Sequence, residues 1–353
     1  MNPKDNERNY IVELLRFLFC IMIVIHHSYR MYGDNKIYAP TGYMGVEFFF
    51  IVTGYYMMKK IDSDKGEKNI GIATKQYILP KYKKMMIILF YSILASICMQ
   101  YISGCNMDWK NNLIGSIPEL LMLQMVGIGY YFPTGAAWYL SAMFLTLMIL
   151  YPLALRYRSS YLHIMAPCIS IILMGYILRS IGNIGNAPGQ DLGFFKVGVW
   201  RAFADIAIGN VLWSVSEWLK GVAEGNKISA LLLGIIEVGG YLLIAYIAKK
   251  CQPGYTDFYI VIIMCISLAI TLSETSITYR LFNFKIWKVL GAFSSIWFLN
   301  NFYVAGYLPS MLPNIDGKKL LYVYIVISAL VSGVVVVAVQ LTNRILARIK
   351  VYM

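Results

Sequence analysis

The chain has 353 residues, of which 59% are apolar or aromatic and 14% are charged, and its formal net charge is +13. Soluble domains typically contain about 45–50% apolar and about 25% charged residues. The mean hydropathy is +0.61, and apolar runs long enough to cross a hydrocarbon core of about 30 Å recur along the chain. This composition excludes a soluble globular enzyme, a disordered protein and a disulfide-stapled secreted domain, and it indicates an all-α, polytopic membrane protein.

The apolar runs predict ten membrane-spanning helices within a single domain that fills residues 1–353. We expect these spans at about 10–29, 42–59, 82–103, 137–156, 162–181, 197–218, 228–248, 257–273, 287–304 and 320–343. The segment 104–136 contains a shorter apolar stretch, which Pro118 and Glu119 interrupt. Because that stretch is short for a span, it predicts a re-entrant or interfacial helix instead.

The Lys and Arg residues divide unequally between the two sides of these spans. With the N-terminus inside, twenty of them lie in inner segments and nine in outer segments, while Arg16 and Arg201 lie within spans. Cytoplasmic loops of membrane proteins are enriched in Lys and Arg, so both termini are expected in the cytoplasm. The positive charge therefore predicts topology and contact with anionic membrane lipids, and no nucleic-acid partner.

Ionisable residues inside membrane spans are functional candidates, because an unpaired charge in the membrane is costly. Arg16 and His27 lie eleven residues apart in the first span, which places them on one helix face, about 16 Å apart along the axis. His26 is rotated by about 100° from that face, so we expect it to contact another helix. An alternative interpretation is that Arg16 forms a buried ion pair with Glu13 that only stabilises packing.

The predicted topology brings polar groups from five spans to the outer half of the membrane. These candidates are His27, Glu47, Trp138, Tyr139, Arg201, Asn300 and Asn301. Trp and Tyr are often interfacial anchors, so Trp138 and Tyr139 have that simpler interpretation as well. The chain has only three histidines, and its six cysteines show no ligand-like spacing, so no metal site is expected.

Five sequence patterns carry a resemblance to a known family. They are VELLRFLFCIMIVIHH with Arg16 and His27, GVEFFFIVTGYY from Gly45, WYLS from Trp138, the Gly-containing stretch from Arg201 to Gly209, and LGAFSSIWFLNN from Leu290. In order and spacing they resemble the acyltransferase-3 family of bacterial integral membrane acyltransferases. Members of this family are ten-span proteins that modify surface polysaccharides, peptidoglycan, glycolipids or small molecules, and the likeness covers essentially the whole chain.

Several positions differ from the family pattern. Glu47 stands where Asp is usual, which keeps the charge, Ser295 stands where Tyr is usual, and Asn301 stands where His is common. The WYLS pattern also lacks the Glu found in subfamilies that carry an extra secreted domain, so we expect no such domain here.

The resemblance implies transfer of an acyl group, most often acetyl, from cytoplasmic acyl-CoA to a hydroxyl at the outer face of the bacterial cytoplasmic membrane. Acyl-CoA would be a co-substrate, with no permanently bound cofactor. The acceptor would be a surface polysaccharide, a glycolipid or a small molecule. Cationic side chains attract the phosphates of the donor, and those expected to bind it are Arg16, Lys81, Lys83 and Lys84.

Within this activity, His27 suits the general base, because imidazole exchanges protons readily at neutral pH. We expect Glu47 to orient the His27 ring, as the acid of a triad does. Arg201 is expected to stabilise the developing oxyanion or to bind an acidic acceptor. Acceptor-site candidates are Trp138, Tyr139, Asn300 and Asn301. We expect one cavity in the outer half of the membrane, lined by His27, Glu47, Trp138, Arg201 and Asn301, with Arg16 on its inner continuation.

Two other classes of function are consistent with the sequence. Polar groups inside spans would also suit a transporter or flippase of a cell-envelope precursor, although the chain shows no internal repeat of the kind common in transporters. A regulatory membrane module with a degenerate catalytic site is a third interpretation, motivated by the Asn at position 301. Turnover of acyl-CoA by the purified protein would separate the enzyme from both.

Overall fold

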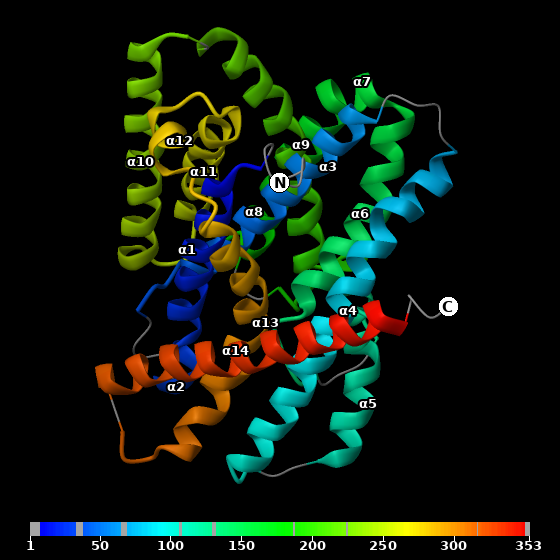
Figure 1. Cartoon of the computed structure of the whole chain (residues 1–353), viewed down its shortest axis with the longest axis vertical. Helices are drawn as coiled ribbons and strands as arrows, with labels where there is room; N and C mark the ends of the chain where they lie inside the picture. Colours follow the sequence, from blue (N-terminus) through cyan, green and yellow to red (C-terminus); the bar gives the residue numbers. More distant parts are fainter. Residues whose placement is uncertain are drawn as a thin grey trace.

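The computed structural model describes residues 8–32, 38–64, 69–105, 108–128, 132–185, 188–223, 225–315 and 317–349. In this part of the chain most residues belong to helices, which pack into one bundle (Figure 1). Some basic residues that contributed to the predicted topology lie outside the described residues, namely Lys4, Lys36, Lys65, Lys68 and Lys350.

Ten long helices within the described residues match the predicted spans. They are α1 (Tyr10–His27), α3 (Gly45–Ser63), α4 (Ile70–Ile102), α6 (Trp138–Arg156), α8 (Ala166–Ile181), α9 (Val197–Ala223), α10 (Lys227–Lys250), α11 (Thr256–Ser273), α13 (Trp287–Met311) and α14 (Gly317–Ile349). Shorter elements connect them: α2 (Tyr29–Tyr32), η3 (Gly42–Met44), α5 (Trp109–Leu120), η4 (Gln124–Val126), α7 (Arg158–Ser160), η5 (Tyr161–Met165), α12 (Ile277–Phe282), and an antiparallel hairpin of β1 (Asp191–Leu192) and β2 (Phe195–Lys196).

By length and composition, seven helical segments of the described chain are apolar enough to cross a membrane, and they contain α1, α4, α6, α8, α10, α11 and α14. The other three long helices, α3, α9 and α13, carry Glu47, Arg201 and Asn301, which weaken their apolar signal. All three of these polar residues are buried. The three helices thus hold these polar residues inside the bundle, where they avoid lipid. The prediction of an all-α polytopic membrane protein is confirmed.

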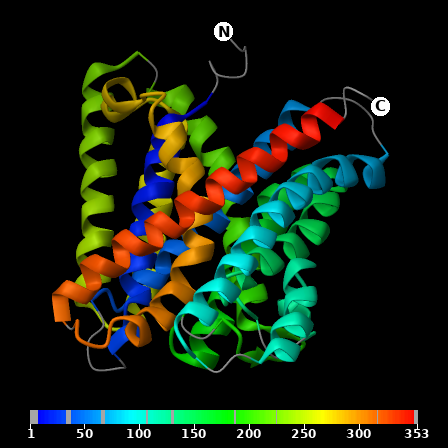
Figure 2. The same ribbon diagram turned by 60° about the horizontal axis from the view of Figure 1, so that its bottom comes forward.

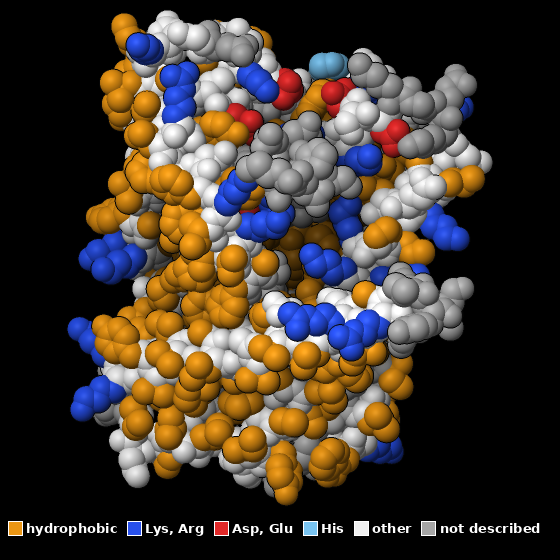
Figure 3. All heavy atoms as spheres, in the orientation of Figure 1, with side chains coloured by type: hydrophobic (Ala, Val, Ile, Leu, Met, Phe, Trp, Pro, Cys, Tyr) orange, Lys and Arg blue, Asp and Glu red, His pale blue; other side chains and the backbone are white. Residues whose placement is uncertain are grey.

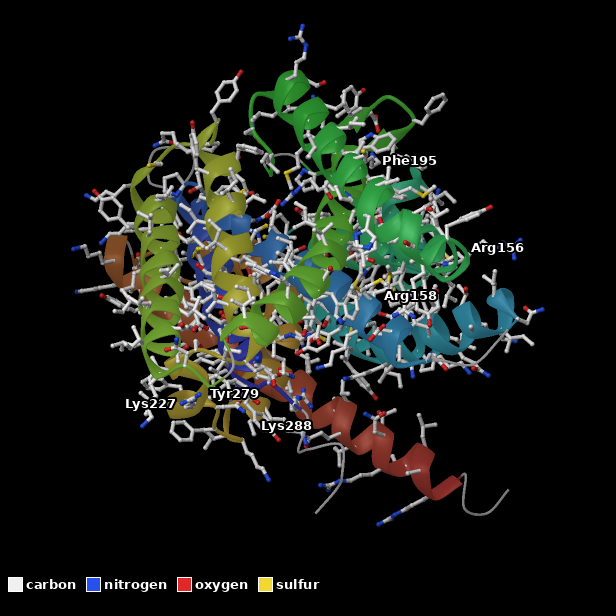
Figure 4. The ribbon with its side chains drawn as sticks, turned by 90° about the horizontal axis from the view of Figure 1, so that it is seen from above. Arg156, Arg158, Phe195, Lys227, Tyr279 and Lys288 are labelled. Carbon is white, nitrogen blue, oxygen red and sulfur yellow. The ribbon has the colours of Figure 1, made fainter. Side chains whose placement is uncertain are left out.

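The described ends of the chain lie at one end of the bundle. Figure 2 shows the beginning of α1 and the end of α14 toward the top, together with the end of α3 and the beginning of α10. In Figure 4, Lys227, Tyr279 and Lys288 lie toward one side of the molecule, whereas Phe195 lies toward the other. We call the end formed by Asp64, Asn69, 157–160, 225–226 and 274–286 the basic end, and the opposite end the far end. The basic end is the one predicted to face the cytoplasm.

Asparagine side chains begin three helices at the basic end. The Oδ1 atom of Asn9 accepts hydrogen bonds from the backbone at the start of α1, and Asn69 and Asn226 do the same for α4 and α10. Asn is among the best N-cap residues, because its side chain satisfies N–H groups that have no partner within the helix. The local sequence therefore fixes where these helices begin.

Helix α4 begins at Ile70 rather than at position 82, where the predicted span starts. The sequence places 70–81 in a loop because Lys75 and Lys81 interrupt the apolar run. A capped helix can nevertheless continue beyond the hydrocarbon core, since long basic side chains reach water while their stems stay on apolar surface.

Two helices differ in length from a simple span. Helix α5 has 12 residues, which is too short to cross a membrane, in agreement with the prediction for 104–136. Helix α14 has 33 residues, so its length of about 50 Å exceeds the hydrocarbon core. Figure 2 shows α14 running diagonally across the bundle, and this tilt accommodates the extra length.

Glycine residues let α3 and α9 approach closely. A Cβ atom on Gly54 would meet the backbone carbonyl of Ile206, and one on Gly209 would meet that of Ile51. Small residues commonly allow membrane helices to associate, since apolar side chains gain little by leaving lipid for protein. These two glycines therefore set the distance between α3 and α9.

Replacing Gly54 with Ala is expected to destabilise the protein by about 1–3 kcal/mol, because the added methyl group would overlap the Ile206 carbonyl. Gly239→Ala is the matched control, since nothing lies within 4 Å of a Cβ atom added there. Ala should be neutral or slightly stabilising at that helical position. Thermal unfolding of the purified variants in detergent checks this, and equal melting temperatures would contradict it.

Candidate active site

A buried ion pair, Glu47–Arg201, joins α3 to α9, and we call it the clasp. The Nε and Nη2 atoms of Arg201 donate to Oε1 of Glu47 at 2.9 and 2.6 Å. The Nη1 atom donates to the carbonyl oxygen of Gly185 at 2.7 Å. Arg201 is 1% exposed and Glu47 is 0% exposed. Because an unpaired charge inside a membrane protein is costly, each side chain of the clasp requires the other.

The clasp also helps to fasten the connection that follows α8. Gly185 of this connection accepts a hydrogen bond from Arg201, and the backbone N–H of the preceding Ile184 donates to Oδ2 of Asp257 at 2.9 Å. The same oxygen of Asp257 accepts the hydroxyl of Tyr43 at 2.7 Å. Neither Asp257 nor Tyr43 was predicted from the sequence, although an acid in the first turn of a span is a signal that would have identified Asp257.

Hydrogen bonds around Asn301 determine which nitrogen of His27 carries the proton. The Nδ2 atom of Asn301 donates to the carbonyl oxygens of Trp297 and Phe298 at 3.1 and 2.8 Å. Its Oδ1 atom therefore faces Nδ1 of His27, 2.5 Å away. An amide oxygen only accepts hydrogen bonds, so Nδ1 of the neutral ring is the donor and Nε2 keeps its lone pair.

Further contacts hold this pair in place. The hydroxyl of Tyr324 on α14 donates to Oδ1 of Asn301 at 3.3 Å and to the carbonyl oxygen of Val24 at 3.2 Å. The ring of Phe302 packs edge-on against His27, with centroids 5.0 Å apart. Three helices thus position one imidazole, and no sequence pattern identified Tyr324 as part of this group.

His26 lies on a different face of α1, as predicted. Its Nδ1 atom donates to the carbonyl oxygen of Ala39 at 2.8 Å, and its ring packs edge-on against Tyr43 with centroids 5.2 Å apart. His26 therefore supports the connection before α3, and the two adjacent histidines have different surroundings.

A cavity of about 270 Å³ lies among α1, α3, α4, α6 and α13. We call it the polar cavity; its lining residues are Arg16, Phe49, Thr53, Tyr56, Tyr77, Lys81, Lys84, Met85, Tyr139, Leu140, Met143, Ser295, Phe298 and Leu299. The structure thus brings together three of the four residues predicted to bind the donor, and Tyr139 with them. Lys83 is exposed and is absent from this wall, so its predicted role is not supported.

Arg16 presents unpaired hydrogen-bond donors at the polar cavity. Its nearest acid is Glu13, with 3.7 Å between Nη1 and Oε2, a separation longer than a hydrogen bond. Glu13 instead accepts from Nη2 of Arg8 at 2.5 Å. The Nε atom of Arg16 is buried with no hydrogen-bond partner among the described residues. Arg16 therefore forms the expected ion pair with Glu13, and its Nε atom stays available to a ligand in the polar cavity.

Aromatic rings form the wall of the polar cavity on the side toward His27. The ring centroids of Phe49, Tyr139 and Phe298 lie 5.4 to 6.2 Å apart. Phe298 precedes Asn301 by three residues on α13, which is about 5 Å along the helix. The cavity therefore ends less than one helical turn from the residue that holds His27.

Three of the five N–H groups of Arg201 donate within the clasp or to Gly185, and the contact of Arg201 with an oxyanion stays a prediction. The predicted contact between Glu47 and His27 is wrong, because Glu47 binds Arg201 while Asn301 binds Nδ1 of His27. A carboxylate buried in the membrane gains more from a guanidinium than from a neutral ring. The polar residues expected to share one cavity therefore form two separate groups, the Glu47–Arg201 clasp and the His27–Asn301 pair.

The prediction of Asn300 in an acceptor site is also wrong. Its Nδ2 atom donates to the carbonyl oxygen of Ile296 and to the hydroxyl of Ser332 on α14, at 3.0 and 3.3 Å. Its Oδ1 atom accepts the hydroxyl of Tyr303 at 2.9 Å. Asn300 is rotated by about 100° from Asn301, and it joins α13 to α14.

Trp138 packs against the clasp. The guanidinium carbon of Arg201 lies 5.1 Å from the centroid of the Trp138 ring, a geometry suited to a cation–π contact. The simpler interpretation of Trp138 as an interfacial anchor is therefore not favoured. Its neighbour Tyr139 lines the polar cavity instead. Two successive residues at the start of α6 therefore contact two different sites, the clasp and the polar cavity.

Arg201→Leu is expected to destabilise the protein by about 3–5 kcal/mol, because it leaves the Glu47 carboxylate buried without a partner. The double variant Glu47→Leu, Arg201→Leu should recover much of this loss, since no charge then stays unpaired. Melting temperatures in detergent give the comparison. A double variant as unstable as the sum of the single variants would show that the two side chains do not act as a pair.

Similarity to known proteins identifies the family of this chain. Residues 9–342 match the acyltransferase-3 family model, described as an acyltransferase domain. No curated protein and no solved structure matches the chain. The family match covers nearly the whole sequence, so it favours the enzyme over the transporter and the regulatory module. The chain belongs to the acyltransferase-3 family and is a multi-pass membrane acyltransferase.

Proposed function

We propose that this protein transfers an acyl group, with acetyl as the first candidate, from cytoplasmic acyl-CoA to a hydroxyl acceptor at the far end, with His27 as general base. The observation that carries the proposal is the hydrogen bond between Nδ1 of His27 and Asn301, because it leaves Nε2 able to accept a proton. The acceptor would be a surface polysaccharide, a glycolipid or a small molecule, and the membrane that of a bacterial cell.

The charge of the polar cavity supports acyl-CoA as the donor. Arg16, Lys81 and Lys84 line it, and cationic groups of this kind bind phosphates through charge-assisted hydrogen bonds. Lys81 is held in the wall, because its Nζ atom lies 3.2 Å from the centroid of the Tyr77 ring and donates to the Tyr77 carbonyl at 3.3 Å.

The size of the polar cavity suits only part of such a donor. Its volume of about 270 Å³ lies below the roughly 300–1,000 Å³ typical of whole-ligand sites. We therefore expect the cavity to hold the thioester arm, while the nucleotide stays near the lysines of α4. Arg16 and His27 are about 16 Å apart along α1, a distance comparable to an extended pantetheine arm.

In the proposed reaction, Nε2 of His27 removes the proton of the acceptor hydroxyl while the oxygen attacks the thioester carbonyl carbon. The tetrahedral intermediate then collapses with cleavage of the carbon–sulfur bond, and the sulfur leaves with the proton held by His27. Asn301 accepts from Nδ1 throughout and so keeps the ring oriented. Its role corresponds to that of the orienting acid in a triad, with a neutral amide in place of the carboxylate.

His27→Ala is expected to lower kcat by about 10²–10⁴-fold, the usual contribution of a general base. His26→Ala should retain most of the activity, because His26 binds the Ala39 carbonyl on another face of α1. Release of free CoA thiol by the purified protein measures both. Equal losses in two folded variants would overturn the assignment of His27 as base.

Asn301 variants supply the control for orientation of the ring. Asn301→Asp retains an oxygen that accepts from Nδ1 of His27, whereas Asn301→Leu has none. We therefore expect the Asp variant to keep more activity than the Leu variant at matched stability. The reverse order would remove the support for Asn301 as the positioning residue.

The donor site is tested by the KM for acyl-CoA. Arg16→Lys should raise it, because an ammonium lacks the planar fork of donors of a guanidinium, and Lys84→Gln should raise it about fivefold through loss of one phosphate contact. Lys83→Gln is the matched control, since Lys83 carries the same charge outside the cavity wall. Equal effects of Lys83 and Lys84 would indicate only long-range attraction.

A further inference from the structure

An apolar groove of about 530 Å³ opens between α1 and α10, on the face of α1 opposite to Arg16 and His27. We call it the α1–α10 groove. On α1 it is lined by Leu15, Leu18, Phe19, Ile21, Met22 and Ile25. None of its lining residues belongs to the polar cavity. The groove is therefore a separate site from the one to which the acyl transfer is assigned.

The groove extends from the middle of the membrane to the far end. Along α1, Leu15 and Ile25 are about 15 Å apart, half of a hydrocarbon core of about 30 Å. On α10 the deepest lining residue is Tyr241, whose ring packs edge-on against Phe19 with centroids 6.1 Å apart and whose hydroxyl bonds to Thr271 at 2.8 Å. The length of the groove thus equals one leaflet of a bilayer.

The mouth of the groove is basic. Lys249, at the end of α10, lines it, and so does Leu321 near the start of α14. Lys318 and Lys319 lie three and two residues before Leu321, in the first turn of α14, and are exposed. Figure 3 shows basic side chains along the left edge of the molecule, over the end of α10 and the start of α14, beside apolar surface. A negatively charged group at this mouth would be attracted by several lysines.

The lining of the groove matches the two parts of a lipid. Every lining residue is apolar except Tyr38, Tyr241 and Lys249, and Lys249 lies at the mouth. A lipid of one leaflet has hydrocarbon of about this length beside a polar headgroup. A lipid therefore fits the groove in both length and charge.

We propose that the α1–α10 groove binds one lipid of the far-end leaflet, with a hydrocarbon chain along α1 and an anionic phosphate headgroup at Lys249. The apolar lining selects the chain, the length matches one leaflet, and the lysines select the charge of the headgroup. This site is independent of the proposed donor, acceptor and general base.

Native mass spectrometry of the purified full-length protein in detergent tests the proposal, with phosphatidylglycerol and phosphatidylcholine of equal chain length as probes. One phosphatidylglycerol should stay bound in preference to phosphatidylcholine. Lys249→Gln should weaken its binding about fivefold, the effect of about 1 kcal/mol per charge. Lys250→Gln is the matched control, because Lys250 carries the same charge but does not line the groove.

A second pair of variants tests the apolar part of the site. Ala245 lines the groove and is exposed, so Ala245→Phe fills the channel without disturbing the packed core. This variant should lose the bound lipid. Leu243→Phe should keep it, since Leu243 is 45% exposed on the same helix and lies outside the groove.

Three outcomes would overturn the proposal. They are equal retention of the two lipids, equal effects of Lys249→Gln and Lys250→Gln, and unchanged lipid binding in Ala245→Phe. The same spectra give the mass of the assembly. A dimer that Ala245→Phe converts to a monomer would assign the groove to a second copy of the chain and would likewise overturn the lipid site.

Discussion

The arrangement of α3 and α9 depends on the pairing of two charges buried within the membrane, Glu47 and Arg201. These two side chains bind each other, and both are fully enclosed. Their pairing needs α3 and α9 to lie close together, which Gly54 and Gly209 permit because neither has a side chain between the helices. A charged pair and a glycine contact on the same two helices thus support one another, and the far-end connection at Gly185 is fixed by the result.

The same pairing explains why His27 has a neutral partner. The Glu47 carboxylate binds Arg201 and therefore does not orient the imidazole of His27. Asn301 orients the ring instead, and its own amide nitrogen donates to two backbone carbonyls. An amide oxygen orients the ring and defines its tautomer without adding a second charge to the membrane interior. The Asn at a position where the family commonly has His is therefore compatible with a working base at His27, which supports the proposed reaction.

Helix α1 has a different use on each of its faces. One face carries Arg16, which lines the polar cavity, and His27, and the opposite face lines the α1–α10 groove. Both spaces have lysines at one end, at the basic end for the cavity and at the far end for the groove. Cationic side chains at membrane surfaces keep their charges in water while their stems cover apolar surface, so each space can combine an apolar interior with an anion-attracting mouth.

The sequence by itself determined the helical class, the approximate spans and the shared face of Arg16 and His27, because hydropathy and helical periodicity depend only on residues close in the chain. It also identified Arg16, Lys81 and Lys84 as a group, which the polar cavity brings together. Only the tertiary structure decided which polar residues pair, since Glu47 meets Arg201 across 154 positions and His27 meets Asn301 across 274. Glu47, Arg201, His27 and Asn301 are all expected at a similar depth of the membrane, so depth alone does not decide which of them pair. The packing of the helices decides it.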